Sequence, residues 1–484
     1  MTVLGVTGLK KILLKKGEMM QLITKILREN VKLSLERLSA GVAVTLLFVA
    51  CSGDLVESKS SSEPGYASWK NAELDAALAE GPSAKDREYF ESLNRDCSKP
   101  YVHKLENMPV DHNHPEKGRF TYYYAHFIHD INAPTVVYLP GGPGGRGMSA
   151  EQNENFNIIA TDTRGLGCNF GTEKTFNLDV LTSEQSAQDL VKVIEDLKLK
   201  SYVIYGTSYG SIPGTILASK LEKSKIVPPP NALVLDGVLG KAPVSYQDFW
   251  AGAFRQWDRL RNEEPRINAL FKDGPLPLNG SANAWGNYLV MTGQRYDETR
   301  TTLLALVDEL NLFESTGIKG STMKSLEKIL AEPIPGYEPE SSDLTLVANS
   351  IGCQELWKTQ HRSVAFYLQP GGKLELRLQQ GAPTADDCIG IPFRYPYDSA
   401  RYSVHAPIYY FNGETDPATS PESGRYHYYH QRDAKIKHFI TVKHGGHVVL
   451  LTSPDLAPCS KKIWDEIFEL GNLSALLNED GHCR

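Results

Sequence analysis

The chain has no internal apolar run of the roughly 18 residues that a membrane-spanning helix requires. It also has no segment that recurs at a fixed spacing, which argues against a solenoid or a propeller. The charge is uneven: the first 50 residues carry eight Lys and Arg against three Glu, although the whole chain has a net charge of −7. The remainder is therefore acidic, which argues against nucleic-acid binding because such surfaces are basic.

The sequence also lacks the short motifs that hold metals and nucleotides. None of its seven cysteines lies in a C-x-x-C pair or a His-rich cluster, the usual ligand spacing of a zinc site. There is no G-K-[ST] sequence and no dinucleotide-binding fingerprint. We therefore expect no metal and no cofactor.

The N-terminal segment is typical of export. A basic stretch, Lys10 to Arg37, precedes the uncharged apolar stretch Leu38 to Ala50, and Cys51 follows at once. A cysteine directly after a small residue resembles the lipobox of bacterial lipoproteins, in which that cysteine is lipidated. We expect residues 1–50 to be a signal peptide, residues 51–88 to form a tether and N-terminal segment, and the protein to be lipid-anchored to a bacterial membrane, in the periplasm or at the cell surface. The alternative is a plain signal peptide with a leftover cysteine.

Export changes how the other cysteines are interpreted. Six remain, and an even number in an oxidising compartment predicts three disulfides, although six cysteines allow 15 connectivities. They are Cys97, Cys168, Cys353, Cys388, Cys459 and Cys483. Their order along the chain favours Cys459–Cys483, which would fasten a predicted helical segment between them.

Predicted strands and helices alternate in two parts of the chain, residues 89–240 and 402–484. Such alternation predicts a mostly parallel, doubly wound sheet of the α/β class. Residues 241–401 lack it and instead favour helices separated by Pro- and Gly-rich loops. We interpret this segment as an inserted, largely helical cap that covers the site and selects the substrate. Its predicted helices are Tyr246–Arg261, Thr301–Phe313 and Met323–Leu330.

One serine has the setting of a catalytic nucleophile. Tyr202–Tyr205 is an apolar, predicted buried strand, and Ile212–Leu221 is a predicted helix. Between them, Gly-Thr-Ser-Tyr-Gly at 206–210 places Ser208 at a strand-to-helix turn, the layout of a nucleophile elbow. The alternative is a glycine-rich turn that happens to contain a serine, so the surrounding sequence has to decide.

A glycine-rich loop, Pro-Gly-Gly-Pro-Gly-Gly at 140–145, follows the predicted strand Thr135–Leu139. Glycine lets backbone N–H groups approach a ligand closely. With a nucleophile elbow, such a loop supplies one oxyanion donor and the residue after the nucleophile supplies the other. We assign these roles to the backbone N–H groups of Gly142 and Tyr209. A phosphate-cradling loop is the alternative, and the missing G-K-[ST] argues against it.

A serine hydroxyl needs a neutral imidazole to take its proton and a buried carboxylate to hold that imidazole. Asp416 follows one late predicted strand and His447 follows the next, so the order is Ser…Asp…His. Asp416 is preferred to Glu414 because it lies deeper in its turn. His447 is preferred to His444 because two glycines before it let the loop fold over the nucleophile.

With these landmarks placed, residues from about 97 to 483 resemble the α/β-hydrolase peptidases of the proline iminopeptidase and tripeptidyl aminopeptidase family. The loop at 140–145 looks like the family's oxyanion loop. The sequence at 162–167 is similar to its Asp-Gln-Arg-Gly-x-Gly turn, and that at 206–210 to its Gly-Gly-Ser-Tyr-Gly. Ile-Gly-Cys-Gln-Glu at 351–355 looks like the Ile-x-Cys-x-Asp of the tripeptidyl branch.

The resemblance carries further expectations about single residues. Asp416 and His447 match the family's acid and base. From the glycine turn at 162–167 itself we expect Asp162 and Arg164 to be structural, and a direct role in substrate binding is the alternative. Glu355 matches the family's acidic position.

The resemblance also extends to the cysteines. It pairs Cys353 with Cys388 and supports the C-terminal pair, which leaves Cys97 with Cys168.

The resemblance implies an α/β-hydrolase fold and an exopeptidase that acts on peptides with a free N-terminus. Such specificity needs a carboxylate to pair with the substrate ammonium group, and Glu355 is the first candidate. Glu263 and Glu264 are weaker ones. Two other functions stay open: an esterase or other acyl hydrolase on the same three residues, and a non-catalytic surface-binding lipoprotein.

Overall fold

The structure is a computed structural model. It describes residues 97–149, 155–169, 176–242, 246–271, 276–281, 284–286, 288–289, 296–331, 347, 350–356, 364–368, 374–378 and 391–484. The expected signal peptide, Cys51 and Cys388 lie outside these residues. Statements about them stay predictions.

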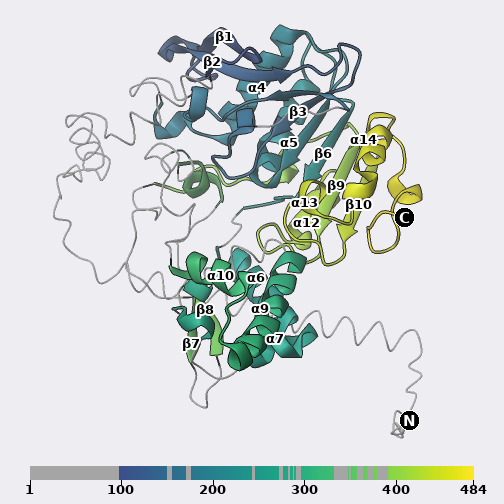
Figure 1. The fold of residues 1–484 in the computed structure, drawn as a ribbon. Coiled ribbons are helices and arrows are strands. Elements are labelled where there is room, and N and C mark those ends of the chain that lie inside the picture. Colours follow the sequence, from purple (N-terminus) through teal and green to yellow (C-terminus); the bar gives the residue numbers. More distant parts are fainter. Residues whose placement is uncertain are drawn as a thin grey trace, which may run out of the picture. The chain divides into compact units, whose positions relative to one another are not determined.

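An eight-stranded sheet forms the centre of the described chain (Figure 1). The strands follow the order β1-β2-β4-β3-β5-β6-β9-β10, and from β4 to β10 every neighbouring pair is parallel. Only β1 and β2 run antiparallel to their neighbours. The mostly parallel sheet that the alternation predicted is thereby confirmed. The strands are β1 Val102–Pro109, β2 Arg119–Phe127, β3 Thr135–Leu139, β4 Asn157–Ala160, β5 Val203–Thr207, β6 Ala232–Asp236, β9 Ile408–Gly413 and β10 Lys437–Val442.

The central strands are apolar because helices cover both faces of the sheet. Every residue of β5, β6 and β9 is buried. One face packs against α4 (Ser183–Leu197) and α5 (Ser211–Leu221), and the other against α13 (Val449–Thr452) and α14 (Ser460–Phe468). A strand buried on both faces must be a continuous apolar run, as these are.

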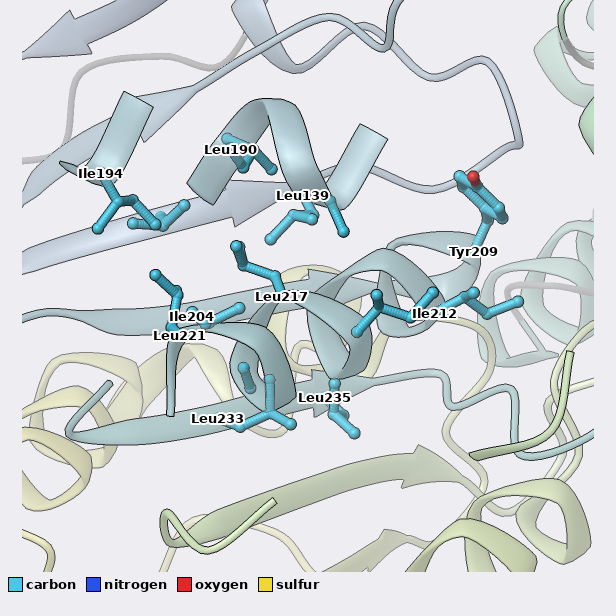
Figure 2. Packing of buried hydrophobic residues seen from close by; sticks show 14 of the residues in the cluster. Leu139, Leu190, Ile194, Ile204, Tyr209, Ile212, Leu217, Leu221, Leu233 and Leu235 are labelled. Atoms are coloured by element: carbon cyan, nitrogen blue, oxygen red, sulfur yellow. The ribbon is translucent and has the colours of Figure 1, made fainter. Parts of the chain in front are cut away.

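Helix α5 lies in the middle of the first layer. It is buried on nearly every side, since ten of its eleven residues are buried. Helix α4 is amphipathic, and the side chain of Thr182 caps it by accepting a hydrogen bond from Gln185 N at 3.2 Å. Figure 2 shows side chains of this layer, and Tyr209, which belongs to the turn Ser208–Gly210, lies in the same cluster. Packing around α5 therefore fixes the position of that turn.

The segment between β6 and β9 has a hydrophobic core of its own. It is built by α6 (Tyr246–Glu263), α7 (Pro265–Leu270), α9 (Tyr296–Thr316) and α10 (Ser321–Ala331). Aromatic rings dominate that core, and they include Trp257, Phe271, Trp285 and Tyr296. The predicted helices are present, extended at their ends.

This segment also contains a β-hairpin that we did not expect. Strand β7 (Val364–Leu368) pairs antiparallel with β8 (Leu374–Leu378). The sequence Leu-Glu-Leu-Arg-Leu of β8 alternates apolar and charged residues, the period of a strand rather than of a helix. The prediction of a largely helical segment did not include this hairpin.

Two of the expected disulfides join described residues. Cys97 bonds Cys168, and Cys459 bonds Cys483. Both pairings are as predicted. Cys353 is also disulfide-bonded, and Cys388, its predicted partner, lies outside the described residues.

No helix in the described residues is both long enough and apolar enough to span a membrane.

His427 is a fully buried histidine that joins the sheet to two helices. It lies on α12 (Pro421–His430), and its ring contacts Thr215 Oγ1 at 2.9 Å and the Tyr410 hydroxyl at 3.0 Å. Thr215 Oγ1 donates its own proton to Ser211 O, so it accepts from His427 Nε2. The Tyr410 hydroxyl then donates to Nδ1, and the imidazole is neutral. Burial lowers the pKa of His427 from 6.5 to about 3.

We predict that His427 makes the fold sensitive to acid. The unfolded chain binds a proton at this residue below pH 6.5, whereas the folded chain does so only near pH 3. The free energy of unfolding should therefore fall as the pH drops through this window, by ~1.4 kcal/mol per pH unit from this residue. Urea unfolding of the wild type and of His427→Gln, at several pH values, measures the slope. The exposed His129→Gln is the control, and equal slopes for wild type and His427→Gln would contradict the prediction.

Candidate active site

Ser208 lies at the end of β5 in a left-handed backbone conformation, with a φ of 53°. A single 3-10 turn, Ser208–Gly210, then leads into α5. A Cβ on Gly210 would lie 2.1 Å from the carbonyl oxygen of Leu139, so only glycine lets this turn pack against the end of β3. Ser208 is partly exposed although Tyr209 is buried. This is the geometry of a nucleophile elbow.

The glycine-rich loop after β3 lies beside the Ser208 side chain. A Cβ on Gly141 would lie 3.0 Å from Ser208 Cβ and 3.5 Å from Ser208 Oγ. Gly145 N–H donates to Gly141 O at 3.0 Å and closes the loop into a turn, inside which Gly142 has a φ of 123°. The loop that carries Gly142 therefore runs close to the hydroxyl. The roles of Gly142 and Tyr209 as oxyanion donors stay predictions.

Asp416 and His447 form a hydrogen-bonded acid–base pair. Asp416 lies in the turn after β9, and its Oδ2 is 2.9 Å from His447 Nδ1. Its other oxygen accepts the backbone N–H groups of Ala418 and Thr419, at 2.8 and 2.9 Å. The Thr419 hydroxyl donates to Oδ2 at 2.6 Å. These bonds fix a buried carboxylate, which in turn keeps the proton of His447 on Nδ1 and leaves Nε2 free to accept one.

The structure separates this pair from the neighbouring acid and histidine that the sequence also offered. Glu414 Oε2 accepts the backbone N–H of His444 at 3.1 Å and pairs with Arg259 at 3.1 Å. His444 Nδ1 is 3.5 Å from the Arg259 guanidinium. Glu414 and His444 therefore belong to an ion-pair cluster with a helix of the inserted segment. Asp416 and His447 are the pair joined by a side-chain hydrogen bond.

The electrostatic environment makes His447 a stronger base than a free histidine. Burial lowers the pKa of His447, but the charge of Asp416, the Asp416 hydrogen bond and the charge of Asp236 raise it, and the net pKa lies above 6.5. The ring packs closely against Gly237, where a Cβ would lie 3.1 Å from His447 Cε1 and 3.2 Å from Nδ1. Gly237 has a φ of 69°, so both its backbone and its lack of a side chain suit this position.

Glu355 is buried, and it contacts Ser183, the first residue of helix α4. Ser183 N donates to Glu355 Oε1 at 2.8 Å, and the Ser183 hydroxyl donates to Oε2. Ser183 Oγ also lies 2.7 Å from the Tyr209 hydroxyl. Burial raises the pKa of Glu355 to about 7, with the two Ser183 hydrogen bonds opposing that rise. The carboxyl group is thus linked through Ser183 to the residue that follows Ser208. Its expected contact with a substrate ammonium group stays a prediction.

Arg164 and Asp162 have structural contacts, as we expected. Arg164 is fully buried, and its guanidinium donates to both carboxylate oxygens of Asp189 on α4. Asp162 Oδ1 accepts the backbone N–H of Met148 at 3.1 Å, and its Oδ2 lies 3.3 Å from Arg146 Nε. The turn at 162–167 is thereby tied both to α4 and to the segment after the glycine-rich loop.

The described residues contain no group of three or more His, Cys, Asp or Glu side chains arranged to hold a metal ion.

Comparison with known proteins identifies the fold. Residues 134–297 match the family model described as alpha/beta hydrolase fold. The chain has the α/β-hydrolase fold. This match, together with the mostly parallel sheet, makes the chain an α/β-fold hydrolase. It does not distinguish a peptidase from an esterase. No curated protein matches the chain.

Several solved structures match the chain at low identity. The chain is similar to proline iminopeptidase from Mycobacterium smegmatis, 13% identical with a TM-score of 0.37 over 72% of this chain and 96% of that one. It is similar to the esterase RhEst1 from Rhodococcus sp. ECU1013, 14% identical with a TM-score of 0.36 over 72% and 96%. A thermophilic esterase from Thermogutta terrifontis is 15% identical with a TM-score of 0.38 over 76% and 100%. Similarity of this size carries no argument about substrate.

The sequence analysis missed one carboxylate beside the site. Asp236 is the last residue of β6, is fully buried, and lies close enough to His447 for each charge to alter the pKa of the other. The sequence pattern that could have identified Asp236 is an acidic residue at the carboxyl end of an apolar predicted strand, because open α/β sheets place their active sites at that end.

We predict that Glu355 acts through Tyr209 on the reactivity of Ser208. Glu355→Gln replaces one acceptor oxygen by an amide that cannot accept from Ser183, which should disturb the Tyr209 hydroxyl and the turn. Hydrolysis of a small neutral ester, which has no ammonium group, should slow about tenfold, equivalent to ~1.4 kcal/mol. The exposed Asp179→Asn is the control. If Glu355→Gln hydrolyses the small ester as fast as the wild type, Glu355 does not act through Tyr209.

Proposed function

We propose that this hydrolase is a serine exopeptidase that removes one or a few residues from the free N-terminus of a peptide. The observation that carries the serine-hydrolase part is the 2.9 Å hydrogen bond between His447 Nδ1 and Asp416 Oδ2. That pair lies on loops that follow β9 and β10, at the same end of the parallel sheet as the Ser208 turn after β5. The exopeptidase part is supported by the resemblance of residues 140–145, 206–210 and 351–355 to the tripeptidyl aminopeptidase branch.

The proposed reaction has two half-reactions. Ser208 Oγ attacks the scissile carbonyl carbon while its proton moves to His447 Nε2, and Asp416 stabilises the resulting imidazolium. The carbonyl oxygen becomes an oxyanion that accepts from the backbone N–H groups of Gly142 and Tyr209. His447 then returns the proton to the leaving amine, which leaves an acyl group on Ser208. Water, deprotonated by His447, releases the N-terminal fragment and restores the serine.

Recognition of a free N-terminus requires a carboxylate near the bound ammonium group, because a charge-assisted contact discriminates against blocked peptides. The resemblance gives this role to Glu355. Its two oxygens already accept from Ser183, so a substrate ammonium group would have to add to these bonds rather than find a free carboxylate. Glu263 and Glu264 also have partners, Arg259 and Arg300 respectively.

An esterase or other acyl hydrolase is the second candidate, since the same three side chains would perform that chemistry. The family match favours neither. Comparing peptide amides with a free N-terminus against N-acylated copies separates the two. An aminopeptidase loses activity on the blocked copy, whereas an acyl hydrolase without N-terminal specificity accepts both.

We also propose that the protein is exported and lipid-anchored through Cys51, on the basis of the basic, apolar and small-residue segments that precede it.

We predict that Cys51→Ala moves the protein from the membrane fraction to the soluble fraction of expressing cells, because the thioether-linked lipid can no longer form. Metabolic labelling with a radioactive fatty acid measures the modification. Equal labelling of wild type and Cys51→Ala contradicts the proposal.

We predict that Ser208→Ala abolishes hydrolysis, with kcat lower by at least ~10⁴-fold, because the nucleophile of the acyl-enzyme is gone. The exposed Ser201→Ala, placed just before β5, is the matched control and should keep full activity. Covalent labelling by an organophosphonate, followed by mass spectrometry of the Ser208 peptide, provides a readout that needs no known substrate. A wild type that neither labels nor turns over any acyl substrate supports the non-catalytic binding protein instead.

A further inference from the structure

Asp236 is a buried carboxylate that the proposed mechanism does not use. It is the last residue of β6, and β6 lies in the sheet between β5, which carries the nucleophile, and β9, which precedes the catalytic acid. Its side chain has no exposed surface. A buried carboxylate at this end of a parallel sheet needs an explanation, because an ionised group loses its hydration there.

The contacts of Asp236 join the two sides of the active site. Its Oδ2 accepts the Tyr205 hydroxyl of β5 at 3.0 Å and the backbone N–H of Leu450 at 2.9 Å. Leu450 follows His447 by three residues, and Val448 between them has a left-handed φ of 58°. Asp236 therefore connects β5, the strand directly before Ser208, to the segment that carries His447. The next residue, Gly237, packs against the His447 ring itself.

No Lys or Arg side chain forms an ion pair with Asp236 in the part of the chain that the structure describes. Its two donors are neutral, and its second oxygen, Oδ1, has no hydrogen-bond partner among the described residues. Burial raises the pKa of Asp236 to about 7, while the Tyr205 and Leu450 hydrogen bonds and the charge of His447 lower it and Asp416 raises it. Tyr138 on β3 also faces it. The carboxyl group can thus gain or lose a proton near neutral pH.

We propose that Asp236 is a positioning residue of the active site, which anchors the His447 segment to the nucleophile strand and, through its own charge, favours the protonated form of His447. This inference rests on the proposed serine-hydrolase function. When His447 takes the proton of Ser208, an ionised Asp236 adds a second negative charge to that of Asp416 and stabilises the imidazolium. When Asp236 is neutral, that support is lost while its hydrogen bonds to Tyr205 and Leu450 stay.

The two roles can be separated by substitution. Asp236→Asn keeps an oxygen that can accept from Tyr205 and Leu450 but removes the charge. Asp236→Ala removes both the bonds and the charge. Tyr205→Phe removes one donor, which leaves Asp236 more readily protonated and should act like a weaker Asp236→Asn. The exposed Asp433→Asn is the matched control.

We predict two distinct effects on the pH profile of kcat/KM. Since the Asp236 charge raises the pKa of His447, Asp236→Asn should move the acid limb to lower pH, by about half a unit or more. Its plateau at alkaline pH should fall less than the roughly 10²-fold expected of Asp236→Ala, in which the anchored His447 segment shifts. An unmoved acid limb in Asp236→Asn overturns the electrostatic role. An unchanged plateau in Asp236→Ala overturns the anchoring role.

A second readout keeps this inference distinct from the proposed function. NMR titration of ¹⁵N-histidine-labelled protein, with His447 assigned from the His447→Gln spectrum, measures the pKa of His447 without a substrate. The titration should move to lower pH in Asp236→Asn and stay in place in Asp433→Asn. If the wild type neither hydrolyses nor labels, the function fails, and the titration still tests the coupling. If the wild type is active and the titration does not move in Asp236→Asn, the electrostatic role of Asp236 fails while the proposed function stands, whether or not Asp236→Ala folds.

Discussion

The sharp turn between β5 and α5 constrains the rest of the site, because Ser208 must hold a left-handed backbone conformation there. A non-glycine residue in that region is strained, and surrounding packing has to compensate. Here α5 is buried on nearly all sides, and Gly210 lies directly against the end of β3. The same packing brings the glycine-rich loop beside Ser208. The nucleophile and the loop are therefore positioned by one core, not by two independent features.

The buried carboxylates around this turn differ in what balances their charge. Asp189 is paired with the buried guanidinium of Arg164, and Asp416 accepts three hydrogen bonds besides that of His447. Asp236 and Glu355 have only neutral donors, and burial raises the pKa of each to about 7. Asp236 contacts the His447 segment, and Glu355 contacts Tyr209 through Ser183. Asp236 and Glu355 can therefore both exchange a proton near neutral pH. Asp236 is one hydrogen bond away from the His447 segment, and Glu355 is linked through Ser183 to Tyr209, which follows Ser208.

These carboxylates therefore fall into two kinds, according to the groups that donate to them. A carboxylate held by a cation or by several backbone amides is fixed in position by those partners, as Asp189 and Asp416 are. A carboxylate buried among neutral donors responds to pH and to a nearby imidazolium. In this site the first kind holds the imidazole and the turn at 162–167. The second kind, Asp236 and Glu355, contacts the neighbouring segments: Asp236 contacts the His447 segment, and Glu355 contacts Ser183.

Local chemistry in the sequence was enough to predict the strands, the α5 turn with Ser208, the glycine-rich loop and the order Ser…Asp…His. Apolar runs and glycine positions act over a few residues, so they can be read without a fold. Asp416 and His447 were chosen over Glu414 and His444 from turn chemistry alone. Only the tertiary structure decided that Glu414 pairs with Arg259, that Glu355 is buried against Ser183, and that Asp236 touches the His447 segment. Each of these contacts joins segments more than 150 residues apart. Burial and long-range pairing depend on how the layers pack, and no short stretch of sequence specifies them.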